Sequence, residues 1–257
     1  MPRFSAHLNF LFTELPLRDR FEAAAKAGFR AVECSNFYEA PAGEIAERLK
    51  SNGLTLALFN MPMGDAAAGE RGLAALAGRE SEFWAAFETA LRYADATGGR
   101  RIHLPAGVVH QGAEHATFVA NLKRAAKAAA AAGVEVLIEP INRRDIPGFF
   151  LTRTEQAREI IAEVGEANLR LQFDLYHRQV AQGDVATAIQ AFVPITAHYQ
   201  IASPPDRGEP DDGEMNYAYL FQLIDGTGFD GWIGCEYRPR QGTVEGLKWA
   251  AACGVSL

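Results

Sequence analysis

The 257-residue sequence has the composition of an ordinary acidic globular protein. Its 48% apolar and 22% charged residues allow a sizeable core, and 25 basic against 32 acidic side chains give a net charge of −7. This charge disfavours binding to nucleic acid, whose backbone attracts basic surfaces. The start of the chain lacks a signal-peptide pattern, no apolar run approaches the roughly 20 residues that span a bilayer, and the three cysteines lack CxxC spacing. We therefore expect a cytoplasmic protein with reduced thiols and no membrane partner.

In the first half of the chain, apolar strand-like runs alternate with helix-like segments. Strands are expected at Ser5–Phe10, Ala31–Cys34, Leu54–Asn60 and Arg101–Leu104, and helices at Pro16–Ala27, Gly43–Lys50, Glu80–Thr97 and Ala116–Ala132. The segment Met61–Gly78 carries four glycines and no strong periodicity. Because loops of this length are usually functional or disordered, we expect it to be a loop over the active-site face.

The second half continues the alternation, and each of its four strand-like runs ends in an oxygen-bearing side chain. The runs are VEVLIEP, LRLQFDLYH, ITAHYQIA and GWIGCEY, with Glu139, Asp174, Gln200 and Glu236 at their ends. Helices are expected at Thr154–Glu163, Asp184–Phe192, Tyr217–Ile224 and Thr243–Ala251, with Thr154 and Thr243 as N-caps. This pattern predicts one domain, residues 1–257, folded as a (β/α)8 barrel. A doubly wound open sheet is the alternative, but no early Gly-rich phosphate turn supports it.

The four strand-end residues form the strongest functional signal. They lie 35, 26 and 36 residues apart, a spacing that suits successive strand–helix units whose strand ends meet at one face of a barrel. A carboxylate after a strand is often only a helix cap or a solvated loop residue. Three carboxylates and an amide oxygen meeting at one face would repel one another without a cation. Their oxygen chemistry predicts a site for Mg²⁺ or Mn²⁺.

Other polar residues near the strand ends are candidates for binding substrate. His177 follows Asp174 by three residues, and Arg207 could hold a substrate carboxylate through two parallel hydrogen bonds. Further candidates are Glu209, Asp145 and, more weakly, His103 and Asn60. The structural alternative for His177 is a capping or core histidine, and the alternative for Arg207 is a solvated loop arginine. His7, His110, His115 and His198 are interpreted as structural.

Several long segments resemble the hydroxypyruvate isomerase family of xylose-isomerase-like barrels. They are RFSAHLNFLFTELP, GDAAAGERGLAALAGRE, IEPINRRDIPGFFLT, LQFDLYHRQV, HYQIASPPDRGEPDDGEMNY and GWIGCEYRP. The resemblance runs from Arg3 to about Trp249. It implies one divalent metal held by Glu139, Asp174, Gln200 and Glu236, with Glu139 and Glu236 as the acid/base pair. Related sugar 3-epimerases usually carry a histidine where this chain has Gln200, so the glutamine favours hydroxypyruvate isomerases.

The resemblance implies an aldose–ketose-type isomerase of a small hydroxy-oxo acid. The leading hypothesis is conversion of hydroxypyruvate to tartronate semialdehyde by proton transfer through a metal-stabilised enediolate, with no nucleotide cofactor. A 2-oxo-tetronate isomerase and a ketose 3-epimerase are the nearest alternatives. A metal nuclease and a non-catalytic sugar-acid binding protein are more distant ones. The only partner expected is the small-molecule substrate, and the oligomeric state stays open, with a homo-oligomer among the alternatives.

Overall fold

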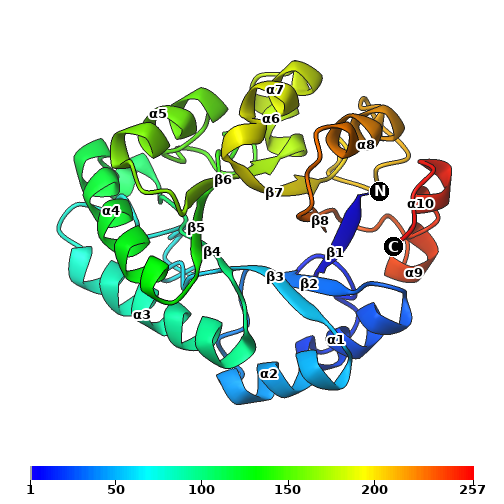
Figure 1. Ribbon diagram of the computed structural model, residues 1–257, viewed down its shortest axis with the longest axis horizontal. Helices are drawn as coiled ribbons and strands as arrows, with labels where there is room; N and C mark the ends of the chain where they lie inside the picture. The colour runs from blue at the N-terminus through cyan, green and yellow to red at the C-terminus, as the bar shows by residue number, and fades with distance from the viewer. Residues whose placement is uncertain (1) are drawn as a thin grey trace.

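The computed structural model describes residues 2–257 and shows a closed parallel barrel surrounded by helices (Figure 1). The strands follow chain order around the barrel, and β1 pairs with β8 to close it. The strands are β1 (Arg3–His7), β2 (Ala31–Cys34), β3 (Thr55–Asn60), β4 (Arg101–His103), β5 (Glu135–Ile138), β6 (Leu169–Asp174), β7 (Thr196–Ile201) and β8 (Trp232–Cys235). The predicted (β/α)8 barrel is therefore confirmed.

Helices follow most strands and cover the outside of the barrel. Their bounds are α1 (Leu17–Lys26), α2 (Ala42–Ser51), α3 (Glu80–Thr97), α4 (His115–Ala131), α5 (Thr154–Val164), α6 (Leu175–Ala181), α7 (Val185–Phe192), α8 (Tyr217–Gly226), α9 (Thr243–Gly246) and α10 (Trp249–Ala252). Two short 3-10 helices, η1 (Val109–Gln111) and η2 (Val193–Ile195), lie between them. Within residues 2–257, no helix is long and apolar enough to cross a membrane.

The longer helices pack on the barrel through an apolar stripe. In α3, Phe83, Phe87, Ala90 and Ala94 recur at helical spacing and are buried. The alanines of α4 that face inward are also buried, and their small side chains allow the helix to approach the strands closely. All six residues of β7 are buried, as expected for a strand covered on both faces.

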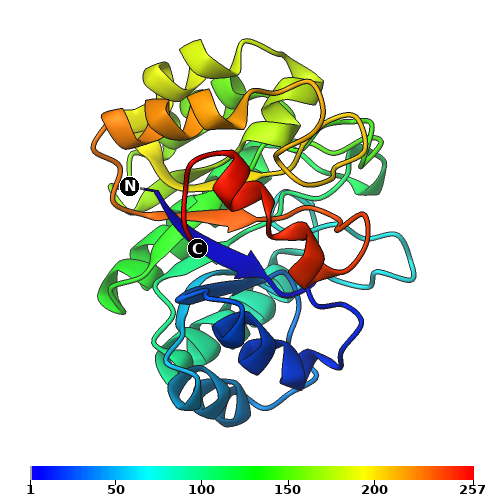
Figure 2. The ribbon, with the colours of Figure 1, turned by 90° about the vertical axis from the view of Figure 1, so that its right-hand side faces the viewer.

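The carboxyl ends of the strands point to the side where the long loops gather (Figure 2). The predicted loop over 61–78 contains no helix or strand, and main-chain hydrogen bonds fix it to the barrel. Gly72 pairs with Ala106 in an isolated bridge, and its amide donates to Met63 O at 3.0 Å. Gly72 has φ +130°, and a Cβ there would lie 2.3 Å from Pro105 O, so only glycine fits this contact.

Four local predictions were wrong. The first strand ends at His7, because residues 8–10 turn back and the amides of Phe10 and Leu11 donate to His7 O. Neither threonine is an N-cap: Arg153 and Gly242 occupy those positions, and the Thr243 hydroxyl accepts from the Phe12 amide instead. The predicted helix over 243–251 is two short helices, α9 and α10. Helix α6, which begins directly after β6, was not predicted.

Candidate active site

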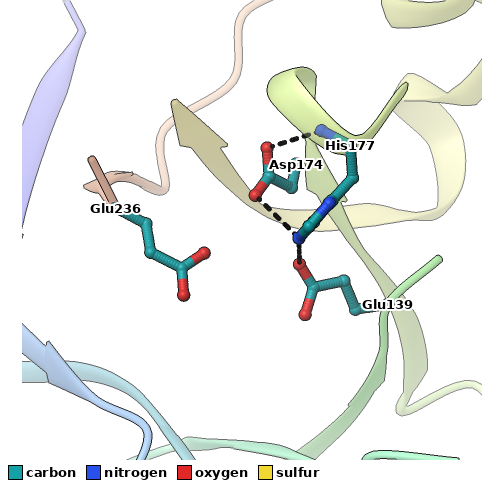
Figure 3. Close-up of side chains that lie close together, drawn as sticks. All are labelled: Glu139, Asp174, His177 and Glu236. Carbon is teal, nitrogen blue, oxygen red and sulfur yellow. Dashed lines mark hydrogen bonds and ion pairs between the residues drawn. The ribbon is translucent and has the colours of Figure 1, made fainter. Parts of the chain in front are cut away.

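Four acidic and imidazole side chains converge at the carboxyl end of the barrel (Figure 3). They are Glu139, Asp174, His177 and Glu236, and each offers a ligand atom within 4.8 Å of the others. Three of them are buried, and Glu236 is nearly so. Three of the four predicted strand-end residues therefore meet at one place, together with one of the predicted substrate-binding residues.

The strands position these carboxylates directly. Glu139 follows β5, Glu236 follows β8, and the Glu236 amide donates to Ile201 O of β7 at 3.1 Å. Asp174 is both the last residue of β6 and the N-cap of α6, because its Oδ1 accepts from the amides of Tyr176 and His177. One oxygen of Asp174 thus fixes the helix, and the other remains directed at the cluster.

We call Glu139, Asp174 and Glu236 the carboxylate cluster. Burial raises the pKa of all three groups, and repulsion between the negative charges raises it further for Glu139 and Asp174. The nearby Arg207 guanidinium lowers the pKa of each carboxyl but does not cancel the rise. The cluster therefore favours either bound protons or a further positive charge.

Arg207 supplies part of that charge. Its guanidinium lies 3.0 Å from Glu236 Oε2, 3.0 Å from Asp145 Oδ2 and 3.9 Å from Asp174 Oδ2. The rings of Phe10 and Tyr176 lie 4.7 and 5.0 Å from it. Arg207 is thus held on several sides by anionic and aromatic groups.

His177 is held as a neutral side chain. Its Nδ1 accepts from the Asn142 main-chain amide at 3.4 Å, which leaves Nε2 as the protonated nitrogen. Nε2 lies 3.8 Å from Glu139 Oε1 and 3.7 Å from Asp174 Oδ2. Burial, more than the neighbouring cations, lowers its pKa well below the usual range.

The residues fit a divalent cation. Glu139 Oε1 and Asp174 Oδ2 are buried and have no hydrogen-bond partner among residues 2–257. Buried carboxylate oxygens without partners are costly, and both face the centre of the cluster. Hard oxygen ligands of this kind suit Mg²⁺ or Mn²⁺ better than a soft metal.

Gln200 is held differently from the three carboxylates. It pairs with Asp174 in the β6–β7 register, which places it beside the cluster on the neighbouring strand. Its Oε1 accepts from Gln172 Nε2 at 2.5 Å, and its Nε2 donates to Glu33 Oε1 at 2.9 Å. Because an amide oxygen has two lone pairs, one remains for a metal.

A cavity of about 160 Å³ opens onto the cluster. Its apolar wall includes Phe10, Met63, Ile141 and Ile146, and its polar wall comprises Ser35, Asn60, Arg71, His103, Glu139, His177, Arg207 and Glu236. This volume is below the roughly 300–1,000 Å³ of pockets for drug-sized ligands, so it suits a small polar molecule.

The remaining predicted substrate-binding residues lie at different distances from this cavity. His103 lines it, with Nδ1 3.2 Å from Asn60 Oδ1. Asp145 stands behind Arg207 and accepts from the Tyr176 hydroxyl at 3.0 Å. The structure does not bring Glu209 to the cavity; its carboxylate faces the Arg240 side chain and lines a separate surface pocket.

Three residues of this region were missed by sequence reasoning. His7, interpreted as structural, places Nε2 3.4 Å from Glu236 Oε1. Arg71 of the 61–78 loop lines the cavity. Glu33 is fully buried on β2, where it contacts Gln200 and His198. A charged residue inside the apolar strand AVEC was the one signal that could have indicated Glu33.

The fold and site define a barrel with an acidic, cation-compatible centre at its carboxyl end, and the comparisons place it in a family. A profile of the xylose isomerase-like TIM barrels matches residues 21–253, and the chain belongs to this family. A 2-oxo-tetronate isomerase of Cupriavidus necator is 54% identical over 97% of both chains. A hydroxypyruvate isomerase of Escherichia coli is 45% identical over 97% of this chain and 98% of that one. The resemblance inferred from sequence motifs is therefore confirmed, and the chain is an enzyme of the isomerase class.

Solved structures agree with this fold. A Brucella melitensis protein described as an AP endonuclease of family 2 superposes with a TM-score of 0.95 at 45% identity, covering 98% of this chain and 99% of that one. A D-psicose 3-epimerase from Clostridium cellulolyticum has a TM-score of 0.77 at 17% identity, over 96% of this chain and 89% of that one. The second likeness shows the shared barrel alone.

Proposed function

We propose that this protein isomerises a small hydroxy-oxo acid by moving its carbonyl group between C2 and C3. The observation that carries the proposal is the carboxylate cluster at the end of a small polar cavity, in a chain whose full-length relatives are named isomerases of such acids. The 54% identity to a 2-oxo-tetronate isomerase favours the four-carbon acid as the substrate. Hydroxypyruvate, which the sequence motifs favour, is the second candidate, supported by the 45% identical relative.

In the proposed reaction, Glu139 or Glu236 removes the C3 proton, the resulting enediolate is reprotonated at C2, and the proton of the C3 hydroxyl moves to the C2 oxygen. A glutamate can do this because burial raises the pKa of both side chains, and a carboxylate with a higher pKa is a stronger base. A divalent ion held by Glu139, Asp174, Gln200 and Glu236 would polarise the carbonyl and stabilise negative charge. The ion, Mg²⁺ or Mn²⁺, and the cytoplasmic location belong to the same proposal.

Other residues would bind and orient the substrate. His177 directs Nε2–H toward the cluster and can donate to a substrate oxygen. Arg207 lies against Glu236 and can hold the reacting oxygens next to that carboxylate. His103 faces the same cavity, with an Nε2 that has no hydrogen-bond partner among residues 2–257. Asp145 would position Arg207 from behind.

Proton NMR in D2O tests this function. The Mn²⁺- or Mg²⁺-loaded protein is incubated with a 2-oxo-tetronate, hydroxypyruvate and D-fructose in separate samples. We expect deuterium incorporation and isomer formation with the acids only, abolished by EDTA. Exchange on the ketose alone would reassign the chain to the epimerases. An abasic DNA duplex serves as a further sample because of the printed description of the Brucella structure, and its cleavage would contradict the proposal.

Two glutamine variants test the roles of the glutamates. Glu139→Gln and Glu236→Gln keep side-chain size but remove the base, and each is expected to lower kcat by roughly 100- to 10,000-fold. Glu47→Gln, on the exposed face of α2, is the matched control and is expected to behave as the wild type. Full activity in either active-site variant would exclude that residue as the acid or base.

A further inference from the structure

Arg71 lines the cavity, and its positive charge is not paired with an acidic side chain among residues 2–257. Among residues 2–257 it forms no ion pair, and its hydrogen bonds go to the carbonyl oxygens of Ala66 and Glu70. Arg207, by contrast, is surrounded by Glu236, Asp145 and Asp174. Two arginines therefore line one cavity, and only one of them retains its charge for a ligand.

The geometry of the Arg71 guanidinium favours a carboxylate. Both of its protein hydrogen bonds are donated by Nη1. The edge formed by Nε and Nη2 thus has no protein partner in the part of the chain that the structure describes. Two parallel N–H groups along such an edge match the two oxygens of a carboxylate.

The loop holds Arg71 in place from both sides. On one side, Glu70 forms an ion pair with Arg79 and accepts from the Asp65 amide. On the other side, Gly72 is fixed by its bridge to Ala106. Because the residues before and after Arg71 are anchored, its side chain is presented to the cavity by a defined backbone, which lowers the entropy lost on binding.

We propose that Arg71 binds the carboxylate of the substrate and thereby selects acids over neutral sugars. This inference rests on the proposed function and deepens it. Arg71 would hold the carboxylate end, and Arg207 and the carboxylate cluster would face the reacting carbons. A neutral ketose offers no negative charge to Arg71, so the same cavity would hold it weakly.

The test compares Arg71→Met and Arg71→Lys with wild type, using Arg143→Met as the control. Arg143 is exposed on the same side of the barrel and lies outside the cavity lining. The first measurement is kcat and KM for the acid that the wild type converts. The second is calorimetric binding of D-glycerate, which has a carboxylate but no carbonyl to isomerise, and of the uncharged D-glyceramide.

Arg71→Met is expected to raise KM and the Kd of D-glycerate by roughly 10- to 100-fold, the range for hydrogen bonds to a charged group, with kcat little changed. Binding of D-glyceramide should not change. The KM and the glycerate Kd of Arg71→Lys should lie between those of the wild type and Arg71→Met, because lysine keeps the charge and loses the paired donors. Arg143→Met should match the wild type.

Two results would overturn the assignment: unchanged KM and glycerate affinity in Arg71→Met, or equal weakening of glycerate and glyceramide. If the wild type converts acids and Arg71→Met keeps its KM, the proposed function stands and the role of Arg71 is refuted. If the wild type converts no acid but binds glycerate through Arg71, the carboxylate site stands and the proposed function fails.

Discussion

Replacing Glu33 with glutamine is expected to destabilise the barrel strongly, because this buried carboxylate accepts several hydrogen bonds. Glu33 is fully buried on β2 and accepts from Ser5 Oγ at 3.1 Å, His198 Nε2 at 2.6 Å and Gln200 Nε2 at 2.9 Å. Burial raises its pKa, but His198 (by its charge and its hydrogen bond), His7 and the hydrogen bond from Gln200 together more than offset this, so the pKa is lowered overall. The protein therefore stabilises the ionised form.

Glutamine has the same shape, but it replaces one acceptor oxygen with an NH2 group. That group would face the donor of either His198 or Gln200, leaving a buried donor unpaired. Loss of a charge-assisted bond costs about 1.5–3 kcal/mol and an unsatisfied buried donor about 1–3 kcal/mol. We expect a loss of about 3–5 kcal/mol, or about 6–20 °C in Tm for a chain of this size.

Thermal unfolding followed by circular dichroism measures this effect. The matched control is Glu135→Gln, a partly exposed strand glutamate paired with Arg101, which should cost at most about 1 kcal/mol. Because the folded pKa of Glu33 is lowered, its contribution is present above the unfolded value of about 4.3 and is lost as pH falls through the lower folded value. The difference between wild type and variant should shrink in strong acid. Equal Tm values at pH 7 would refute this account of Glu33.

Four further predictions concern the site and its loop. The pKa values of the carboxylate cluster are raised, to about 7 for Asp174 and Glu236, so their stabilising contribution is lost as pH rises through those values; the metal-free protein should have a lower Tm at pH 8 than at pH 5.5. Mn²⁺ at 100 times its Kd should restore about 2.7 kcal/mol at pH 8, and an unchanged Tm would count against a metal site. Gly72→Ala should cost about 2–4 kcal/mol by urea unfolding, because its Cβ would meet Pro105 O. Gly69→Ala, with φ +79° and open space around it, is the control and should cost less. Arg207→Met should lower kcat more than it raises KM, and a pure KM effect would contradict the contact with Glu236.

The strand ends of the site could be predicted from sequence because their signals are local. Glu139, Asp174 and Glu236 each follow an apolar run, and a parallel barrel brings the ends of such runs to one face. The same reasoning treated Asp174 only as a strand end. It is also the N-cap of α6, so the short connection at this point held a helix where a loop was expected.

The residues that were missed depend on contacts between distant parts of the chain. Arg71 lies in a loop without periodicity, and it lines the cavity in a fold where the next residue, Gly72, pairs with the distant Ala106. His7 faces Glu236 because β1 and β8 are neighbours, which requires barrel closure. Sequence spacing cannot show how an individual side chain is partnered, as Glu209 and Arg240 also illustrate.

The pairing of β1 with β8 has a consequence for how the protein is made. The first strand leaves the ribosome early but cannot find its partner until Trp232–Cys235 has been synthesised. Until then, the carboxyl that completes the acidic centre is still missing from the nascent chain, and the exposed edge of β1 has no neighbour on that side. A cation that requires all three carboxylates could therefore bind only after Glu236 has been synthesised.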